Sequence, residues 1–376
     1  QMQDGSFSAE GEDGSGAGNL GQDLVFRAYT PAKLYWVMQL YDKYDGKEWT
    51  QSAIMTKGKN ALDTYKSSYQ TEVVQNISIV KPMSRLLPYA YKPLHFFWQE
   101  SREEFTKPMG IIRKKDSVSY RLQNDKLPDL PWQYTVVSTV PDPERCQIIR
   151  AWREPVRNYG WNYRQLPRRQ ISERVQQLAE EITEDCETAL DKALAIRDYL
   201  RENFTYNQDV AAAPDDVEIT DYFLFESKQG ICQHYAQALT LLARLAGLHS
   251  RLATGYSPGN YNLLANYFEI YEYHAHAWTQ IFIEPFGWLT FDGSPPGALR
   301  LEENPVMLKP LLDPFESKWS VNTPELSARS PLPSQPGNLA QMGRSSMKKS
   351  SSGQGNLEKQ SDIQKKIAAA YEEVYN

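Results

Sequence analysis

Three short stretches of this sequence carry the residue types that a thiol-dependent catalyst needs. The first, residues 230–236, reads GICQHYA and contains Cys232. The second contains His274 and His276, and the third ends in Asp292. A cysteine that opens a helix, a histidine on a strand and an aspartate closing the next strand can form a nucleophile, its base and the group that orients the base.

Cys232 is placed to react as a thiolate. An ordinary thiol, with a pKa of about 8.5, is mostly protonated at neutral pH, and only the thiolate attacks. We expect Gly230 to turn the chain tightly into a helix that begins at Cys232, where unpaired N–H groups and the helix dipole favour an anion. The same N–H groups can bind an oxyanion. The alternative is a cysteine that only fills space, as most free cysteines do.

Two histidines are candidates for the base. His274 and His276 are two residues apart and would share one face of a strand. Either could serve, but the apolar strand that follows anchors His276 more firmly. His234 lies two residues after Cys232. On a helix it points away from the thiol, so we predict a capping or surface role for it.

Asp292 is the candidate that would orient the base. A hairpin that turns at residues 284–287 would bring it opposite residues 276–279. There its carboxylate could fix the imidazole tautomer and stabilise the imidazolium. A register slip of one residue would move it to the other face of the sheet. The alternative is a turn residue before Gly293.

A metal site is the other chemistry that these residue types suggest. Cys232, His234, His274 and His276 are all zinc-ligand types. However, the first two, on a helix, would point about 200° apart. We therefore predict neither a metal site nor a cofactor.

The residues around these stretches predict helices followed by an antiparallel sheet. Apolar residues at helical spacing mark three helices, at 172–182, 188–203 and 232–245. Four strands are expected at 251–256, 267–271, 276–283 and 288–291. This half of the chain is therefore predicted to be α+β.

Residues 21–140 have a different texture and are predicted to form an all-β, sandwich-like domain. Short β-branched or aromatic runs lie at 24–29, 34–41, 72–80, 117–122 and 134–140. We expect their aromatic side chains to pack rather than to bind a ligand. Because no reactive group stands out, this domain is expected to present partners or substrate beside the cleft.

The remaining segments complete the predicted organisation. Residues 1–20 are Gly-, Ser- and acid-rich and are expected to be disordered. Pro141-Asp-Pro143 marks the start of a core over 141–312. A flexible linker is expected at 313–356 and a short helix at 357–376. The arginines between 150 and 169 are assigned to a solvated surface or inter-domain ion pairs.

The bulk composition excludes some classes of function. The net charge of −6 and the pI of about 5.6 give no footprint for nucleic-acid binding. No apolar run approaches the roughly 18–20 residues of a membrane span. The chain opens on Gln1, and we read it as part of a longer protein. Three cysteines do not make a disulfide framework. Either Cys146 pairs with Cys186, or both are free.

Taken in order, four blocks resemble the transglutaminase-like superfamily of papain-like thiol enzymes, in particular bacterial membrane-anchored transglutaminase-like proteins. They are Gly230-Ile-Cys-Gln-His-Tyr-Ala236, Arg251-Leu-Ala-Thr-Gly-Tyr256, Ala275-His-Ala-Trp278 and Asp292-Gly-Ser-Pro295. The likeness covers roughly residues 24–310. Two departures stand out: Gln233 replaces a frequent Glu, and Asp292-Gly replaces the usual Asp-Pro.

The resemblance implies a papain-like core with Cys232, His276 and Asp292 as catalytic residues. His274, Gln233 and Trp278 would support them. The implied reaction is acyl transfer from a glutamine carboxamide of a protein or peptide, through a thioester, to an amine or to water. A thiol protease or amidase and a non-catalytic scaffold are the alternatives, and the second oxyanion donor is unassigned. Such proteins lie outside the cytoplasm, between transmembrane helices.

Overall fold

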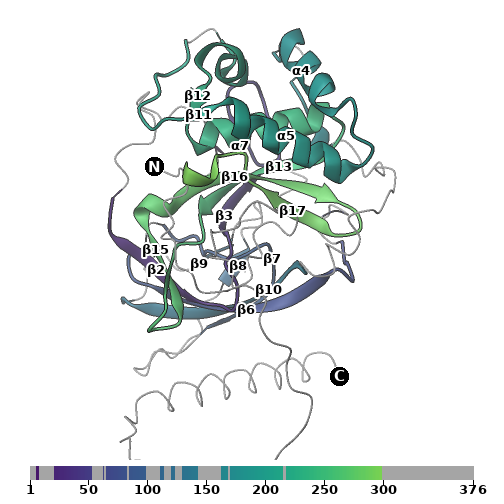
Figure 1. Ribbon diagram of the computed structural model, residues 1–376. Helices are drawn as coiled ribbons and strands as arrows, with labels where there is room; N and C mark the ends of the chain where they lie inside the picture. The colour runs from purple at the N-terminus through teal and green to yellow at the C-terminus, as the bar shows by residue number, and fades with distance from the viewer. Residues whose placement is uncertain are drawn as a thin grey trace, which may run out of the picture. The chain divides into compact units, whose positions relative to one another are not determined.

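The computed structural model describes residues 6–7, 21–52, 62, 65–82, 84–98, 111–113, 120–122, 129–142, 162–167, 170–214 and 217–298. All of them belong to one compact unit, Gln1–Thr323. Within it, helices cover one face of a four-stranded sheet, and a six-stranded sheet lies on the other side (Figure 1). The linker and helix predicted at 313–376, Cys146 and most of the arginines between 150 and 169 lie outside the described residues.

The helical layer contains α4 (Glu173–Thr183), α5 (Ala189–Asn203), α6 (Ile219–Asp221) and α7 (Cys232–Leu245), with a π-helical segment, η2, at Tyr222–Ser227. The hydroxyls of Ser172 and Thr188 cap α4 and α5 by accepting N–H bonds from the first turn. The helix α7 begins without a capping side chain at Ile231. It ends before Gly247, whose φ of +88° suits a helix terminus.

The middle layer is an antiparallel sheet with the order β17-β16-β13-β3. Its strands are β3 (Trp36–Tyr41), β13 (His249–Tyr256), β16 (Ala275–Ile283) and β17 (Gly287–Phe291). The edge strand β3 comes from the N-terminal region, so the strand pairing crosses the boundary predicted at residue 141. A Cβ on Gly255 would lie 1.9 Å from the backbone oxygen of Trp36, so this pairing needs a glycine there.

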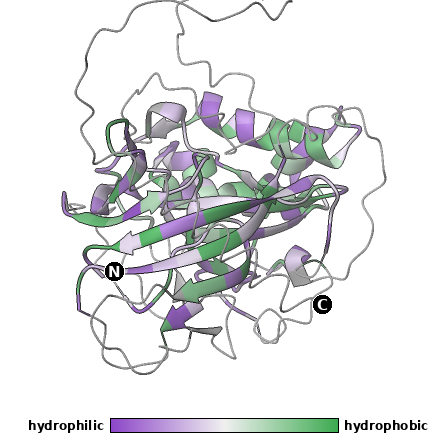
Figure 2. Ribbon diagram, turned by 90° about the horizontal axis from the view of Figure 1, so that it is seen from below, coloured by the Kyte–Doolittle hydropathy of each residue, from purple (hydrophilic) through white to green (hydrophobic). Residues whose placement is uncertain are grey.

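The outer layer is an antiparallel sheet with the order β14-β15-β2-β6-β10-β7. Its strands are β14 (Asn260–Asn262), β15 (Tyr267–Tyr271), β2 (Leu24–Tyr29), β6 (Gln70–Ile79), β10 (Trp132–Pro141) and β7 (Lys92–Trp98). Hydrophobic and hydrophilic residues follow one another along its strands (Figure 2). The hairpin β14–β15 comes from the C-terminal half, so this sheet also draws on both parts of the chain.

Short elements connect these layers. The strands β1 (Ser6–Phe7), β5 (Trp49–Thr50) and β4 (Lys43–Tyr44) form a small sheet, β8 (Ile111–Arg113) pairs with β9 (Tyr120–Leu122), and β11 (Thr205–Tyr206) pairs with β12 (Gln229–Gly230). Single 3-10 turns occur at η1 (Asn162–Arg164), η3 (Glu272–His274) and η4 (Pro296–Ala298). Within residues 1–20, predicted to be disordered, Ser6–Phe7 thus pair with β5, and the others are not described.

Two hydrophobic cores hold the layers together. One lies between the two large sheets and includes Trp36, Tyr134 and Trp278. The other lies between the four-stranded sheet and the helices and includes Leu239 and Ile281. The predicted α+β class with a preceding β-rich region is confirmed, and the sandwich-like packing is made against the sheet that also carries the helices. Among the described residues, no helix combines the length and apolar character that crossing a bilayer requires.

Arg244, near the end of α7, joins three backbone segments. The residue is 2% exposed, and its guanidinium donates to the carbonyl oxygens of Ser250, Asp42 and Gln165, at 2.8, 2.7 and 2.6 Å. It also lies 4.9 Å from the ring centre of Trp49. The side chain therefore fastens α7 to the start of β13 and to two loops.

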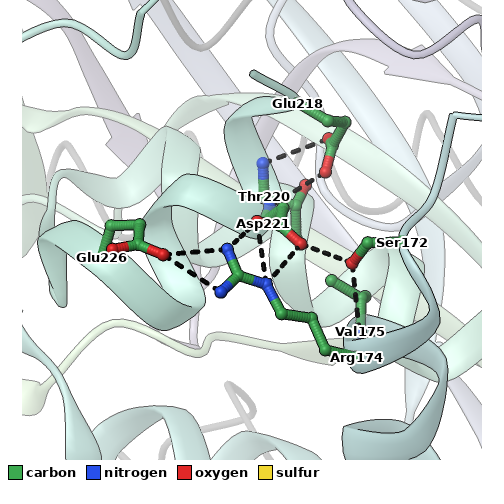
Figure 3. A network of polar contacts seen from close by, with 7 residues as sticks. All are labelled: Ser172, Arg174, Val175, Glu218, Thr220, Asp221 and Glu226. Carbon is green, nitrogen blue, oxygen red and sulfur yellow. Dashed lines mark hydrogen bonds and ion pairs between the residues drawn. The ribbon is translucent and has the colours of Figure 1, made fainter.

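Replacing Arg244 by methionine should lower the free energy of unfolding by about 3–5 kcal/mol, because three buried carbonyl groups lose their donor. Urea unfolding followed by tryptophan fluorescence measures the change. Arg174→Met is the matched control. Arg174 pairs with Asp221 and Glu226 (Figure 3), but its side chain is 44% exposed and water can replace it. Equal losses in the two variants would contradict the role given to Arg244.

Candidate active site

The nucleophile candidate Cys232 is the first residue of α7. A contact between α7 and β16 determines which way its face of the helix points. Residues 232, 236 and 240 follow at four-residue spacing on one face of the helix. On that face the Thr279 hydroxyl, from β16, donates to the Ala236 carbonyl at 2.9 Å. The hydroxyls of Thr240 and Thr279 are also 2.9 Å apart. The face that carries Cys232 is thereby held against β16.

The hairpin β16–β17 brings His276 and Asp292 together. Thr279 pairs with Phe291, so Asp292 comes one residue beyond the last pair, as the sequence predicted. The His276 Nε2 atom lies 2.7 Å from the Asp292 Oδ2 atom, and both side chains are buried. The backbone N–H of Ser294 donates to Asp292 Oδ1 at 2.9 Å.

The thiol of Cys232 lies on the other side of the His276 ring from Asp292, so the three side chains form a line. Its sulfur lies close enough to the imidazole of His276 to raise the pKa of that ring. Because Nε2 of this ring faces Asp292, Nδ1 is the nitrogen left for the sulfur. Cys232 is 8% exposed, so the contact is shielded from bulk water. The structure therefore brings together the three residues that the sequence singled out.

The electrostatics of the pair favour its charged form. Burial lowers the pKa of His276, but the charges of Asp292 and Cys232 and their hydrogen bonds raise it more, to about 10. Burial alone would raise the pKa of Asp292. The charge and hydrogen bond of His276, with Arg201 and the Tyr35 hydroxyl, nevertheless hold it well below its usual range.

The other two histidines near the site bind backbone groups. His234 Nδ1 accepts the N–H of Ile231 at 3.2 Å, so its predicted capping role is correct. It is buried, and burial lowers its pKa to about 4 against the smaller opposing effect of that bond. His274 Nδ1 accepts the N–H of Tyr271 at 2.9 Å, in the turn before β16. Among the described residues, no three His, Cys, Asp or Glu side chains form a group that could hold a metal.

The remaining expected supporting residues lie close by. Trp278 is fully buried, and its ring stacks 6.3 Å from that of His276, measured between ring centres. Gln233 is half-buried at the second position of α7. Gly230 does not act as predicted, because it lies in β12 rather than in a tight turn. A Cβ there would come within 2.8 Å of both Phe223 and His234, so close packing requires the glycine.

Two tyrosines of the site were missed by the sequence analysis. The Tyr35 hydroxyl donates to Asp292 Oδ2 at 2.7 Å, and its ring stacks on His276 at 5.9 Å between ring centres. This corrects the expectation that residues 21–140 contribute no reactive group to the site. Nothing local marks Tyr35 among the aromatic residues around it. The second, Tyr206, contacts Cys232 from β11. Little in the sequence marks Tyr206, because it lies just after the helix α5, in a segment for which no function was predicted.

The three residues of the candidate site lie within a match to a known protein family. Residues 176–293 match the model of the transglutaminase-like superfamily. The chain is 37% identical over 136 residues to the uncharacterized protein YebA of Bacillus subtilis (strain 168), a match that covers 35% of the chain and 18% of that protein. It is 25% identical over 269 residues to a protein-glutamine gamma-glutamyltransferase of Pseudomonas aeruginosa, covering 69% of the chain and 35% of that protein. The chain thus spans well under two thirds of either relative.

A solved structure shares the fold. The periplasmic domain of TgpA from Pseudomonas aeruginosa superposes with a TM-score of 0.53 at 21% identity, covering 78% of this chain and 94% of that domain. The match includes the N-terminal β-rich region as well as the helices and sheet that carry the candidate site. The family match identifies residues 176–293 as a transglutaminase-like domain, and the superposition shows that the fold around it is shared.

Proposed function

We propose that this protein is a cysteine-dependent acyltransferase of the transglutaminase type that acts on glutamine carboxamides of proteins or peptides. The observation that carries the proposal is the buried line of Cys232, His276 and Asp292 at the start of α7. The similarity to a protein-glutamine gamma-glutamyltransferase supports the choice of substrate group.

In the first half-reaction the Cys232 sulfur attacks the carboxamide carbon, and a carbon–sulfur bond forms. The carbon–nitrogen bond then breaks, and ammonia leaves with a proton from His276. Asp292 keeps the imidazole oriented and stabilises its cationic form. The product is a thioester on Cys232.

In the second half-reaction a primary amine, such as a lysine side chain, attacks the thioester. Its proton passes to His276, the sulfur leaves, and an isopeptide bond remains. Water in place of the amine would give a carboxylate. Tyr35 and Trp278 stack beside His276, and the three reacting side chains are at most 8% exposed. This shielding from water supports transfer to an amine rather than hydrolysis.

The proposed location is outside the cytoplasm, in a longer membrane-anchored protein. The fold shared with the periplasmic domain of TgpA supports the location. Anchoring through further segments rests on the resemblance to membrane-anchored family members. The proposed partners are a protein or peptide that supplies the glutamine and an amine or water that accepts the acyl group.

Incubation with a glutamine-donor protein and a labelled primary amine tests the activity. The wild type should incorporate the label, and Cys232→Ala should abolish incorporation because no thioester can form. Cys186→Ala is the matched control and should keep the activity, since Cys186 follows α4 and its thiol contacts the Ile182 carbonyl. Donor cleavage without incorporation would indicate a thiol protease or amidase instead. No turnover of either kind would favour a scaffold.

Asp292→Asn should lower the rate of amine incorporation by about 10²- to 10⁴-fold, because the amide keeps the shape but not the charge that stabilises the imidazolium. The pKa of His276 should fall with it. NMR titration of the histidine rings measures both proteins. The internal control is His234, whose ring should stay neutral down to about pH 4 in either. An unchanged His276 titration would contradict the role given to Asp292.

The same two histidines should affect stability in opposite pH ranges. The folded pKa of His276 is raised from 6.5 to about 10, so its stabilising contribution is complete below pH 6.5 and is lost as pH rises through 10. The folded pKa of His234 is lowered from 6.5 to about 4, so its contribution is present above pH 6.5 and is lost as pH falls through 4. Urea unfolding of His276→Gln and His234→Gln against pH measures the two effects. A loss of the His276 contribution on the acid side would contradict this assignment.

A further inference from the structure

The first residue of α7, Cys232, has its backbone N–H beside the sulfur. The N–H groups of His234 and Tyr235 already bond to the carbonyl of Ile231, at 2.9 and 3.3 Å. The Tyr206 hydroxyl lies close to Cys232, and Cys232 affects the pKa of the phenol. An oxyanion on a carbon attacked by this sulfur would form next to the Cys232 N–H group. One donor is a weak oxyanion site, so a second donor is expected close by.

Tyr206 is held over this point by its own backbone. It pairs in parallel with Gly230, two residues before the nucleophile. Thr205 N–H donates to the Lys228 carbonyl and Asn207 N–H to the Gly230 carbonyl, each at 3.0 Å. Bonds on both sides of Tyr206 therefore fix where its side chain begins.

The ring and the hydroxyl of Tyr206 are positioned as well. The ring stacks on Tyr235, in the first turn of α7, with 6.1 Å between ring centres. The side chain therefore lies at the start of α7, beside Cys232. Burial, followed by the nearby Cys232 and Asp292, raises the pKa of this phenol, which thus keeps its proton and can donate.

We propose that the Tyr206 hydroxyl and the Cys232 N–H together form the oxyanion hole of this site, an assignment that rests on the proposed function. When the sulfur bonds to the carbonyl carbon, the carbonyl electron pair moves to the oxygen. The oxyanion accepts hydrogen bonds from the Cys232 N–H and from the Tyr206 hydroxyl. When the intermediate collapses, the electron pair returns and the leaving group departs with the proton of His276.

The neighbouring candidates fit this role less well. Trp278 Nε1 is buried without a hydrogen-bond partner, but its indole belongs to the core between the two sheets. Cys232 belongs to the core on the other side of the four-stranded sheet. The Tyr35 hydroxyl is engaged with Asp292. The Tyr206 ring lies over the first turn of α7, and its hydroxyl is close enough to Cys232 for the two groups to interact electrostatically.

Two reagents that modify the same sulfur separate this role from others. p-Nitrophenyl acetate acylates Cys232 through a tetrahedral oxyanion and releases nitrophenolate. Iodoacetamide alkylates it by displacement at a saturated carbon, where no oxyanion forms. Both reactions are carried out on the intact protein. After digestion, mass spectrometry follows the peptide that contains Cys232, so labelling of Cys146 or Cys186 does not interfere.

Tyr206→Phe should slow the acylation at least 10-fold and up to about 10²-fold, the usual effect of losing one oxyanion donor. Its alkylation should stay within about threefold of the wild type. Alkylation depends on the thiolate fraction of Cys232, and in this proposal the hydroxyl acts on the oxyanion instead. Tyr235→Phe is the matched control. Its hydroxyl is buried without a partner and its ring stacks on Tyr206, so both rates should stay close to those of the wild type.

Each other outcome overturns the proposal. Equal slowing of both reactions would mean that Tyr206 acts on the sulfur itself, and no slowing of either would mean that the oxyanion binds elsewhere. Slowing by Tyr235→Phe to the same degree would reduce Tyr206 to a packing role. The proposed function fails differently: a wild type that is acylated by the ester but never transfers from glutamine would keep the oxyanion hole and lose the transglutaminase assignment.

Discussion

The contact between α7 and β16 is the constraint on which the site depends. Thr279 donates to the Ala236 carbonyl and meets the Thr240 hydroxyl inside the core, where an unpaired hydroxyl would be costly. A shift of the helix by one residue would break both bonds and turn Cys232 about 100° away from His276. Two buried threonines thus set the position of the helix along the strand, and with it the distance between sulfur and imidazole.

A buried ion pair is stabilising only where its hydrogen bonds are complete. Asp292 meets this condition, since His276 and Tyr35 donate to one oxygen and the Ser294 N–H donates to the other. The three donors come from three separate parts of the chain. The charge state of the candidate base is therefore a property of the assembled unit, including its N-terminal region.

Much of the site could be predicted from local sequence. The helix from Cys232 to Leu245 has regular apolar spacing, and the turn at 284–287 sets the hairpin that delivers Asp292. Both depend on residues close to one another in the chain. The histidine was a harder choice, because two residues on one strand face are equivalent until their partners are known. Their contacts separate the two: His274 accepts the N–H of Tyr271, whereas His276 meets Asp292.

What could not be predicted involves pairings between distant segments. The strand β3 has hydrophobic residues that suit any buried strand, and nothing in them names β13 as the partner. Tyr35, just before β3, follows from that pairing. Tyr206 is similar, since a two-residue parallel pair leaves no periodic pattern. The turn predicted at Gly230 was wrong, because in sequence a glycine that makes room for neighbouring side chains cannot be distinguished from one that makes a turn.

The insertion of β3 beside β13 also determines when reactivity can arise. Tyr35 and Asp292 are separated by 257 positions in the chain. The hydrogen bond from the Tyr35 hydroxyl to the Asp292 carboxylate can therefore form only after nearly the whole unit has been synthesised and its two ends have folded together. Until then β13 has an open edge, and the imidazole lacks its oriented counter-ion. In a partly synthesised chain, Cys232 and His276 are therefore present before the Tyr35–Asp292 hydrogen bond can form.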